Sequence, residues 1–140
     1  MGIDFGERRT GVALSDPTGT LASPFETIER RAGQRLPLKA LEEIARAQGV
    51  VALVVGVPID LAGEETEWTL RVRAAGEELA RRLGLPVEFV DERFTSVQAQ
   101  RAVRSSGLPK RERERKDRVD RAAAALILQG WLDRRPREAP

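Results

Sequence analysis

Three acidic residues stand in segments whose other residues favour burial. Asp4 lies inside a short β-strand pattern, Glu92 follows an apolar run, and Asp120 lies on the apolar face of a helical pattern near the C-terminus. A buried carboxylate is costly unless it is paired, hydrogen-bonded or metal-bound, and like charges held close disfavour one another unless a cation intervenes. Oxygen ligands suit hard ions, so the three acids predict a Mg²⁺ or Mn²⁺ site if the fold brings them together.

The first two acids also have ordinary explanations. Asp4 could pair with Arg8 or Arg9 in the turn that follows its strand. Glu92 could belong to a solvated strand end in which Arg93 pairs with a neighbouring acid. Each explanation is sufficient for its own residue, so the functional interpretation depends on the convergence of all three acids.

The third acid has alternatives of its own. Asp120 could pair with Lys116, one helical turn earlier, or oppose the helix dipole near an N-terminus. Asp117 lies three residues earlier on the same helical face and competes for the role of third metal ligand. We choose Asp120, which shares its face with Ala124 and Ile127.

Composition limits which chemistry is open. The chain has 140 residues, 41% hydrophobic and 33% charged, and we expect a single domain over residues 1–140. Cysteine and histidine are absent, which excludes thiol catalysis, thiolate metal sites and the commonest general base, so carboxylates must carry any catalysis. No apolar run approaches the ~20 residues that span a bilayer and no signal-peptide pattern occurs, so we expect a cytoplasmic protein without membrane contacts.

Charge is distributed unevenly along the chain. Residues 1–100 carry 12 basic and 16 acidic side chains, a balance of −4, whereas residues 101–140 carry 12 basic and 6 acidic, a balance of +6. The basic segment could line a phosphate backbone, or it could be a solvated charged loop diluted by Glu112 and Glu114. The candidate contacts in it are Lys110, Arg111, Arg113, Arg115 and Lys116.

Hydrophobic periodicity predicts the elements that must position these residues. After the strand that contains Asp4, we expect strands at residues 10–14 and 21–28, the latter at a sheet edge or bulged because it contains Pro24. The remaining pattern predicts a helix at 38–48, a doubly covered strand at 50–57, a helix at 65–83, a strand at 87–90, a helix at 96–105 and a C-terminal helix.

This order of elements predicts an α/β fold with a mixed five-stranded sheet and helices on both faces. Right-handed crossovers give the spatial strand order 3-2-1-4-5, with the first and fourth strands in the centre. Asp4 on the first strand, Glu92 at the end of the fifth strand and Asp120 on the last helix can then converge.

Four motifs in this order resemble those of the YqgF (RuvX) family, and the resemblance spans nearly the whole chain. The motifs are Gly2–Ile3–Asp4–Phe5–Gly6, Val55–Gly56–Val57–Pro58, Asp91–Glu92–Arg93–Phe94–Thr95–Ser96 and Lys116 with Val119–Asp120. The resemblance implies a ribonuclease-H-like fold related to Holliday-junction resolvases. It also implies a nuclease that trims the 5′ end of the 16S ribosomal RNA precursor in ribosome biogenesis.

The resemblance further implies that Asp4, Glu92 and Asp120 are the catalytic residues. Two divalent ions, Mg²⁺ or Mn²⁺, would lie roughly 3.5–4 Å apart between them, with Asp4 as the bridging ligand. Arg93, Thr95 and Ser96, together with the basic segment, would then hold the nucleic acid.

Two departures from the family pattern affect the expected site. Family members usually have a few more apolar residues before Gly2, so the first strand looks truncated. Resolvase relatives also place an acid at the end of the fourth strand, where this chain has Gly56–Val57–Pro58, so Glu92 must substitute from the neighbouring strand.

Other functions remain open from the sequence. The first alternative is a resolvase that cuts four-way DNA, which would favour a two-fold dimer. The second is a module that binds nucleic acid without cleaving it, which would not need the three intact acids. The third is an actin-like ATPase, which would need a second domain. With 4% aromatic residues and no evident dimer surface, we expect a monomer that acts on RNA, recognised by backbone shape.

Overall fold

The computed structural model describes residues 1–31, 33–94 and 113–135, and it gives backbone alone for Phe94 and residues 113–120. The elements in chain order are β1 (Gly2–Phe5), β2 (Arg9–Ser15), β3 (Ala22–Glu29), α1 (Leu38–Ala47), β4 (Leu53–Val57), α2 (Glu67–Leu83), β5 (Val87–Asp91), η1 (Glu92–Phe94) and α4 (Arg113–Arg134). The helix expected at residues 96–105 lies outside the described part of the chain.

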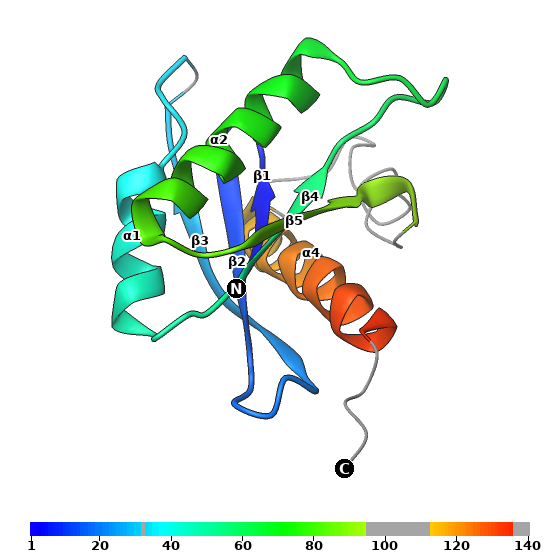
Figure 1. Ribbon diagram of the computed structural model, residues 1–140. Helices are drawn as coiled ribbons and strands as arrows, with labels where there is room; N and C mark the ends of the chain where they lie inside the picture. The colour runs from blue at the N-terminus through cyan, green and yellow to red at the C-terminus, as the bar shows by residue number, and fades with distance from the viewer. Residues whose placement is uncertain (32, 95–112, 136–140) are drawn as a thin grey trace.

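The strands pair into one mixed sheet of five, in the order β3-β2-β1-β4-β5 (Figure 1). β1 pairs antiparallel with β2 and parallel with β4, and β5 continues the parallel part of the sheet. The order predicted from the sequence is therefore confirmed. Because β1, β4 and β5 are parallel, their carboxyl ends meet at one edge of the sheet, called the carboxyl edge below.

Helices cover both faces of this sheet. α1 and α2 lie on one face and α4 crosses the other (Figure 1). Side chains alternate between the two faces along each strand, so Ile3 and Phe5 enter the core beneath α1 and α2. Gly2 and Asp4 point the other way, toward α4.

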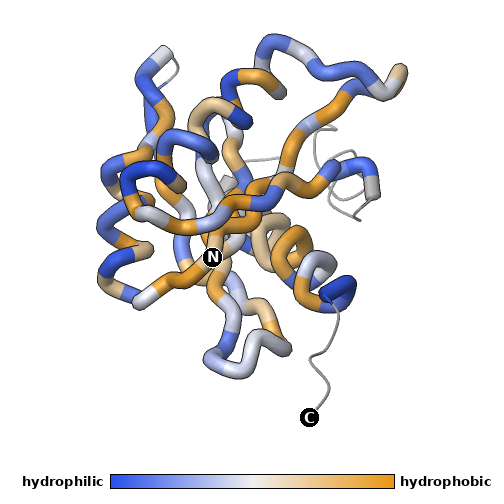
Figure 2. The backbone as a smooth tube through the Cα atoms, viewed as in Figure 1, coloured by the Kyte–Doolittle hydropathy of each residue, from blue (hydrophilic) through white to orange (hydrophobic). Residues whose placement is uncertain are grey.

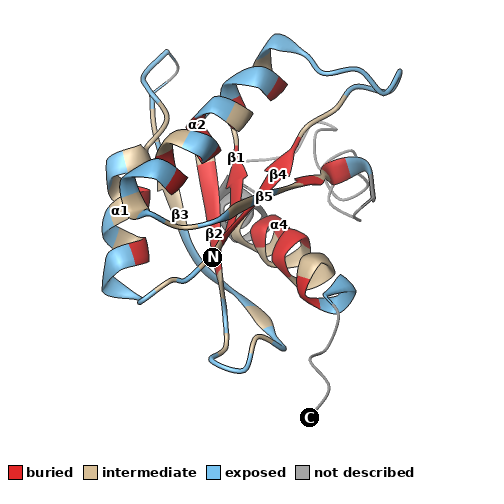
Figure 3. Ribbon diagram, viewed as in Figure 1, coloured by how far each residue is buried: buried red, intermediate tan, exposed pale blue. Residues whose placement is uncertain are grey.

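Burial follows this layered plan. All five residues of β4 are buried, as expected for a parallel strand covered on both sides, and Figure 3 shows burial concentrated on the central strands. Figure 2 shows the matching hydrophobic band through the middle of the molecule, with hydrophilic residues on the outer loops. No helix in the described residues is both long enough and apolar enough to cross a membrane.

Two element boundaries differ from the sequence prediction by more than one residue. The strand expected from residue 50 begins at Leu53, since Val51 points away from the core and is 79% exposed. The helix expected from residue 65 begins at Glu67, because Thr66 is its N-cap. The Thr66 hydroxyl accepts a hydrogen bond from the Thr69 amide at 3.2 Å, and the Thr69 hydroxyl accepts one from the Thr66 amide at 3.0 Å.

The prediction for Pro24 is confirmed. β3 is an edge strand, and its pairing with β2 shifts register between Val12 and Ala13, so that Val12 lies opposite Glu26 and Ala13 opposite Pro24. One residue of β3 is thus left over as a bulge, next to the proline that cannot donate a backbone hydrogen bond.

Candidate active site

Asp4 is buried in the middle of the sheet, on the face covered by α4. Its relative exposure is 1%. On β2 the residue opposite it is Gly11, which brings no side chain to that face of the sheet. A buried carboxylate on a central strand is held in one orientation by its surroundings, which is the arrangement that a metal ligand requires.

Glu92 is buried to the same extent, although it follows the last residue of β5. Its relative exposure is also 1%, so the sequence-based alternative of a solvated strand end is wrong for this residue. The carboxylate lies against Gly56 of β4: a Cβ atom placed on Gly56 would be 3.0 Å from Oε1 of Glu92 and 3.3 Å from its Cγ. Glu92 therefore occupies space that any other residue at position 56 would fill.

Gly56 also connects the two acids in space. Gly2 pairs with Val54 and Ile3 pairs with Val55, so the next positions along β1 and β4 are Asp4 and Gly56. Neighbouring strands lie about 4.8 Å apart. The Glu92 carboxylate thus lies over the strand adjacent to Asp4 and on the same face.

α4 carries the third predicted acid toward this site. A Cβ atom on Gly2 would be 2.9 Å from the backbone carbonyl of Ala124, so the helix backbone lies directly on β1 there. Ile127 packs against Gly56, and the Trp131 indole N–H donates a hydrogen bond to Glu88 near the start of β5. α4 therefore runs antiparallel to β4 and β5, and its residues before Ala124 lie toward the carboxyl edge.

Asp120 lies in α4, one turn before Ala124. Its side chain, like that of Asp117, is outside the described structure, so the choice between the two stays a prediction. Among the side chains that are described, no group of three or more acidic residues forms a metal site. The described part of the site is thus the pair Asp4 and Glu92.

Asp91 and Arg93 form an ion pair on the outer side of the same strand end. Arg93 Nη2 lies 2.7 Å from Asp91 Oδ2, and the Arg93 amide donates to Asp91 Oδ1 at 2.9 Å. Hydrogen bonds from the Arg93 side chain hold the pKa of the Asp91 carboxyl below its usual range, and Asp91 in turn raises the pKa of Arg93. The expected pairing of Arg93 with a neighbouring acid is thus confirmed for Asp91.

The other predicted nucleic-acid contacts are not tested. Thr95, Ser96, Lys110 and Arg111 lie outside the described residues, and Arg113, Arg115 and Lys116 lie in α4 without described side chains. Arg93 is a candidate contact at the carboxyl edge, where its Nη1 would be 3.0 Å from a Cβ atom on Gly63 in the loop after β4.

The residues present suit a divalent cation. Two carboxylates, each 1% exposed, lie on one face of the sheet, and the missing side chain of Gly56 leaves room for that of Glu92. Buried carboxylates commonly coordinate metals, and oxygen ligands select hard ions such as Mg²⁺ and Mn²⁺. Sequence reasoning did not identify Gly56 as part of the site, although a glycine inside an otherwise apolar β-branched strand is a signal of close approach.

Comparison with known proteins gives consistent results. The family model of RuvX, described as Holliday junction resolvase, matches residues 1–134. A Moorella thermoacetica protein named "Putative pre-16S rRNA nuclease" is 44% identical over 134 residues, which cover 96% of this chain and 94% of that protein. A Leifsonia xyli protein of the same name is 44% identical over 133 residues, covering 95% of this chain and 84% of its own length.

The fold is also found among solved structures. Thermus thermophilus RuvC has a TM-score of 0.52 at 15% sequence identity, with 94% of this chain and 92% of that chain covered. A second structure of the same protein, in complex with a Holliday junction substrate, matches with the same TM-score. At this identity the likeness shows the fold alone, and it confirms the predicted ribonuclease-H-like architecture.

Proposed function

Because this chain belongs to the RuvX family, we propose that it is a metal-dependent nuclease that hydrolyses phosphodiester bonds in the precursor of 16S ribosomal RNA. The observation that carries the proposal is the Glu92 carboxylate lying over Gly56, beside buried Asp4. The names of relatives at 44% identity supply the substrate. Processing of this precursor would place the protein in the cytoplasm. Residues 1–140 would form a single nuclease domain.

Asp4, Glu92 and Asp120 would hold the metal ions in this proposal. Bound Mg²⁺ or Mn²⁺ supplies Lewis-acid stabilisation of charge at the phosphodiester and a water nucleophile at neutral pH. The chain itself supplies fixed carboxylate positions. Burial on β1 and the close approach to Gly56 restrict the rotamers of Asp4 and Glu92, so little reorganisation remains when a substrate binds.

Arg93 would orient the nucleic acid at the rim of this site. Asp91 holds its guanidinium through two nitrogen atoms, Nε and Nη2, and Nη1 lies toward the loop at Gly63. A guanidinium held in this way presents N–H donors in a fixed orientation to a phosphate. Thr95, Ser96 and the basic segment at 110–116 remain candidate contacts on the same strand of substrate.

The first experiment tests the metal site with Asp4→Asn and Glu92→Gln. Both variants should lose cleavage of a 16S precursor fragment in Mg²⁺ or Mn²⁺ by at least about a hundredfold, because each loses one charged ligand. Both should also lose the rise in melting temperature that the metal gives the wild-type protein, which is a readout independent of activity. Wild-type turnover in Asp4→Asn would contradict the proposed metal site.

Matched controls show whether loss of cleavage requires loss of an acid at the proposed metal site or follows from loss of any acidic residue. Asp16→Asn removes an acid from the exposed turn between β2 and β3, and Glu88→Gln removes an exposed acid from β5. Neither should change cleavage or the metal-dependent stabilisation by more than about twofold. Wild-type protein that binds RNA and never cleaves it would support the non-catalytic module instead.

A second function is favoured by the description of the family as Holliday junction resolvase. Symmetric cutting of a four-way DNA junction needs two active sites, which a two-fold dimer would supply. Cleavage of the RNA precursor and of a synthetic junction should therefore be compared at matched salt, with the molar mass measured by light scattering. We expect a monomer that prefers RNA; a dimer that cuts paired junction strands and spares the RNA would establish the second function.

A further inference from the structure

Two arginine side chains lie over one tryptophan in the first turn of α2. The guanidinium carbon of Arg71 is 5.5 Å from the centroid of the Trp68 ring, and that of Arg30 is 6.0 Å from it. Stacking of this kind fixes a guanidinium while leaving its N–H donors available at the ring edge. Trp68 packs partly buried against the core, so it provides a rigid support for two positive charges.

The described structure provides no counter-charge for either arginine. Within the described residues, no carboxylate oxygen lies within 4.0 Å of the Arg30 or Arg71 guanidinium, while the ion pairs that do form engage other arginines. Arg30 Nη1 donates to the backbone carbonyl of Gln34, and the buried Arg30 Nε has no acceptor among these residues. An incoming anion at the exposed ends of the two guanidinium groups would supply the counter-charge.

These side chains lie at the same edge of the sheet as the candidate active site. The Arg30 amide donates to the carbonyl of Arg8 at 2.8 Å, and Arg8 is in the exposed turn that follows β1, four residues after Asp4. β3 runs parallel to β1, because both are antiparallel to β2, so Arg30 also follows a carboxyl end. The N-terminus of α2, in green in Figure 1, is likewise above the carboxyl ends of β1 and β4.

We propose that Arg8, Arg30 and Arg71, together with Trp68 as their support, bind the phosphate backbone of the RNA strand on the α2 side of the scissile bond. These four residues are called the arginine band. The inference rests on the proposed function, which places the scissile phosphodiester at Asp4 on the α4 side of the same edge. A strand crossing that edge would meet the turn at Arg8 first, then Arg30, then Arg71.

Phosphate is the ligand chemistry that this arrangement favours. Guanidinium groups bind phosphate oxygens through paired N–H donors, and such contacts position a strand without reading its bases. An acidic protein segment offers similar charge, but it lacks the regular repeat of anions that three successive arginines along one edge can follow. Binding of an acidic protein segment is therefore treated as the alternative outcome of the experiment.

The test measures binding without catalysis. A fluorescently labelled single-stranded fragment of the 16S precursor is titrated in EDTA, in the Asp4→Asn background, at several salt concentrations. Arg8→Gln, Arg30→Gln and Arg71→Gln should each weaken binding about three- to tenfold. Each should also reduce the magnitude of the slope of log K against log salt by about 0.7, the value for one phosphate contact on a single strand.

Trp68 is a positioning residue, so its variants must separate support of the arginines from packing. Trp68→Phe keeps an aromatic face and should bind RNA within about twofold of the parent. Trp68→Leu keeps apolar bulk against the core but offers no aromatic face, and it should weaken binding about threefold or more. Equal affinities for the two variants, both with the parent melting temperature, would remove Trp68 from the band.

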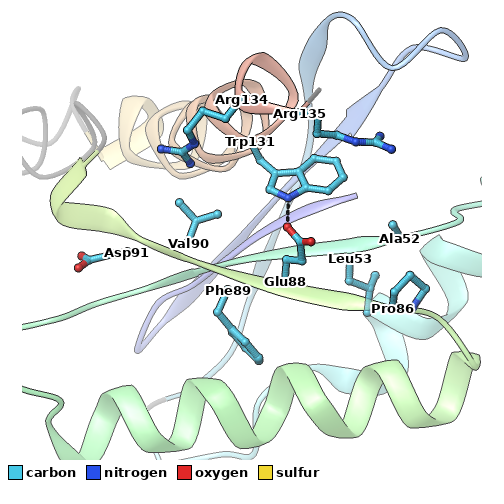
Figure 4. A pocket seen from close by; sticks show the side chains of 10 residues that line it. All are labelled: Ala52, Leu53, Pro86, Glu88, Phe89, Val90, Asp91, Trp131, Arg134 and Arg135. Atoms are coloured by element: carbon cyan, nitrogen blue, oxygen red, sulfur yellow. Dashed lines mark hydrogen bonds between the residues drawn. The ribbon is translucent and has the colours of Figure 1, made fainter. Parts of the chain in front are cut away.

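The chain contains a matched control at the opposite edge of the sheet. Arg135 stacks on Trp131 at 4.6 Å, beside a cavity of about 660 Å³ that Glu88 and Pro86 also line (Figure 4). This pair has the same chemistry as Arg71 on Trp68 but lies near the start of β5. Arg135→Gln should change RNA affinity by less than twofold.

Three results would overturn the arginine band. The first is a triple variant of Arg8, Arg30 and Arg71 with unchanged affinity and salt slope, and the second is an Arg135→Gln effect as large as that of Arg71→Gln. The third is parent protein that binds poly-glutamate peptide but no RNA. Because the assay needs no cleavage, loss of the proposed metal site would leave a positive result for the band intact.

Discussion

At the residue scale, the least expected feature of the site is a glycine, Gly56, on the central strand β4. Gly56 leaves the volume in which Glu92 and Ile127 lie, so Gly56→Ala should displace the Glu92 carboxylate while the fold persists. We expect overpacking to cost about 1–3 kcal/mol of stability and cleavage to fall by at least tenfold. Thermal unfolding and the precursor cleavage assay together check this prediction.

A second glycine provides the control for that substitution. Gly130 lies in α4, where the nearest neighbour of an added Cβ would be Arg134 Nη2 at 3.9 Å. Gly130→Ala should therefore raise stability by up to about 1 kcal/mol and leave cleavage unchanged. Equal activity of both alanine variants would mean that Glu92 does not need its position over Gly56.

Asp16 permits a prediction about pH that is remote from the active site. A hydrogen bond from the Thr18 hydroxyl, together with the amides of Leu21 and Thr20, holds the pKa of the Asp16 carboxyl below its usual 3.8. The folded-state pKa is lowered, so this carboxylate stabilises the fold above the unfolded-state pKa, and that contribution disappears as the pH falls through the folded-state value.

The stability difference between wild type and Asp16→Ala should accordingly be largest near neutral pH and shrink in acid, as followed by denaturant unfolding. Thr18→Val should raise the pKa of Asp16 toward its usual value, measured by NMR titration of the carboxyl carbon. An unchanged pKa in Thr18→Val would contradict the assignment of the hydroxyl as the main cause.

At the element scale, the N-terminus of α2 links the sheet to the arginine band. The capping pair Thr66 and Thr69 begins the helix, and the Thr69 hydroxyl also donates to the carbonyl of Pro58 after β4. Thr66→Ala should cost about 1 kcal/mol, or roughly 3 °C in melting temperature, whereas Thr66→Ser should keep the cap and its stability. If serine and alanine lower the melting temperature equally, the side-chain cap is not the cause.

The sequence predicted the elements better than their boundaries. Alternation around Asp4 and the continuous apolar run of β4 determine which strands are central, and the handedness of crossovers then gives the strand order. The start of α2 was predicted two residues too early, because Thr66 and Thr69 were not identified as a capping box. In this box the N3 threonine takes the place of the usual glutamate. β4 starts late because Val51, though apolar, points into solvent.

The sequence predicts which acids form the site, and their role stays a prediction, but it does not predict how Asp4 and Glu92 are arranged. Burial of Asp4 follows from its strand, but burial of Glu92 depends on Gly56 of the preceding strand β4, on the other side of α2 in the chain, which spacing alone cannot place. The arginine band was missed for the same reason, since Arg8, Arg30 and Arg71 come from a turn, a strand end and a helix. Only the tertiary fold brings them to one edge.

At the scale of the whole molecule, the proposals assign separate roles to the two ends of the sheet, one at the carboxyl ends of β1, β4 and β5 and the other at their amino ends. The carboxyl edge holds Asp4, Glu92, Arg93 and the residues of the arginine band, while the opposite edge carries the Asp16 turn and the Trp131–Arg135 stack. A substrate that contacts both the metal site and the band must span the thickness of the sheet. This arrangement favours an extended nucleic-acid strand as the substrate over a small ligand enclosed in a pocket.

The bulge in β3 has a further consequence at this scale. An edge strand offers unpaired backbone groups on which the edge strand of another molecule can grow, and that process leads to aggregation. Pro24 removes one of the donors and the adjacent bulge breaks the regular spacing of the rest, while the exposed carboxylate of Glu26 adds repulsion between copies. The same irregularity that limits pairing with β2 thus protects the protein from polymerising through its open edge.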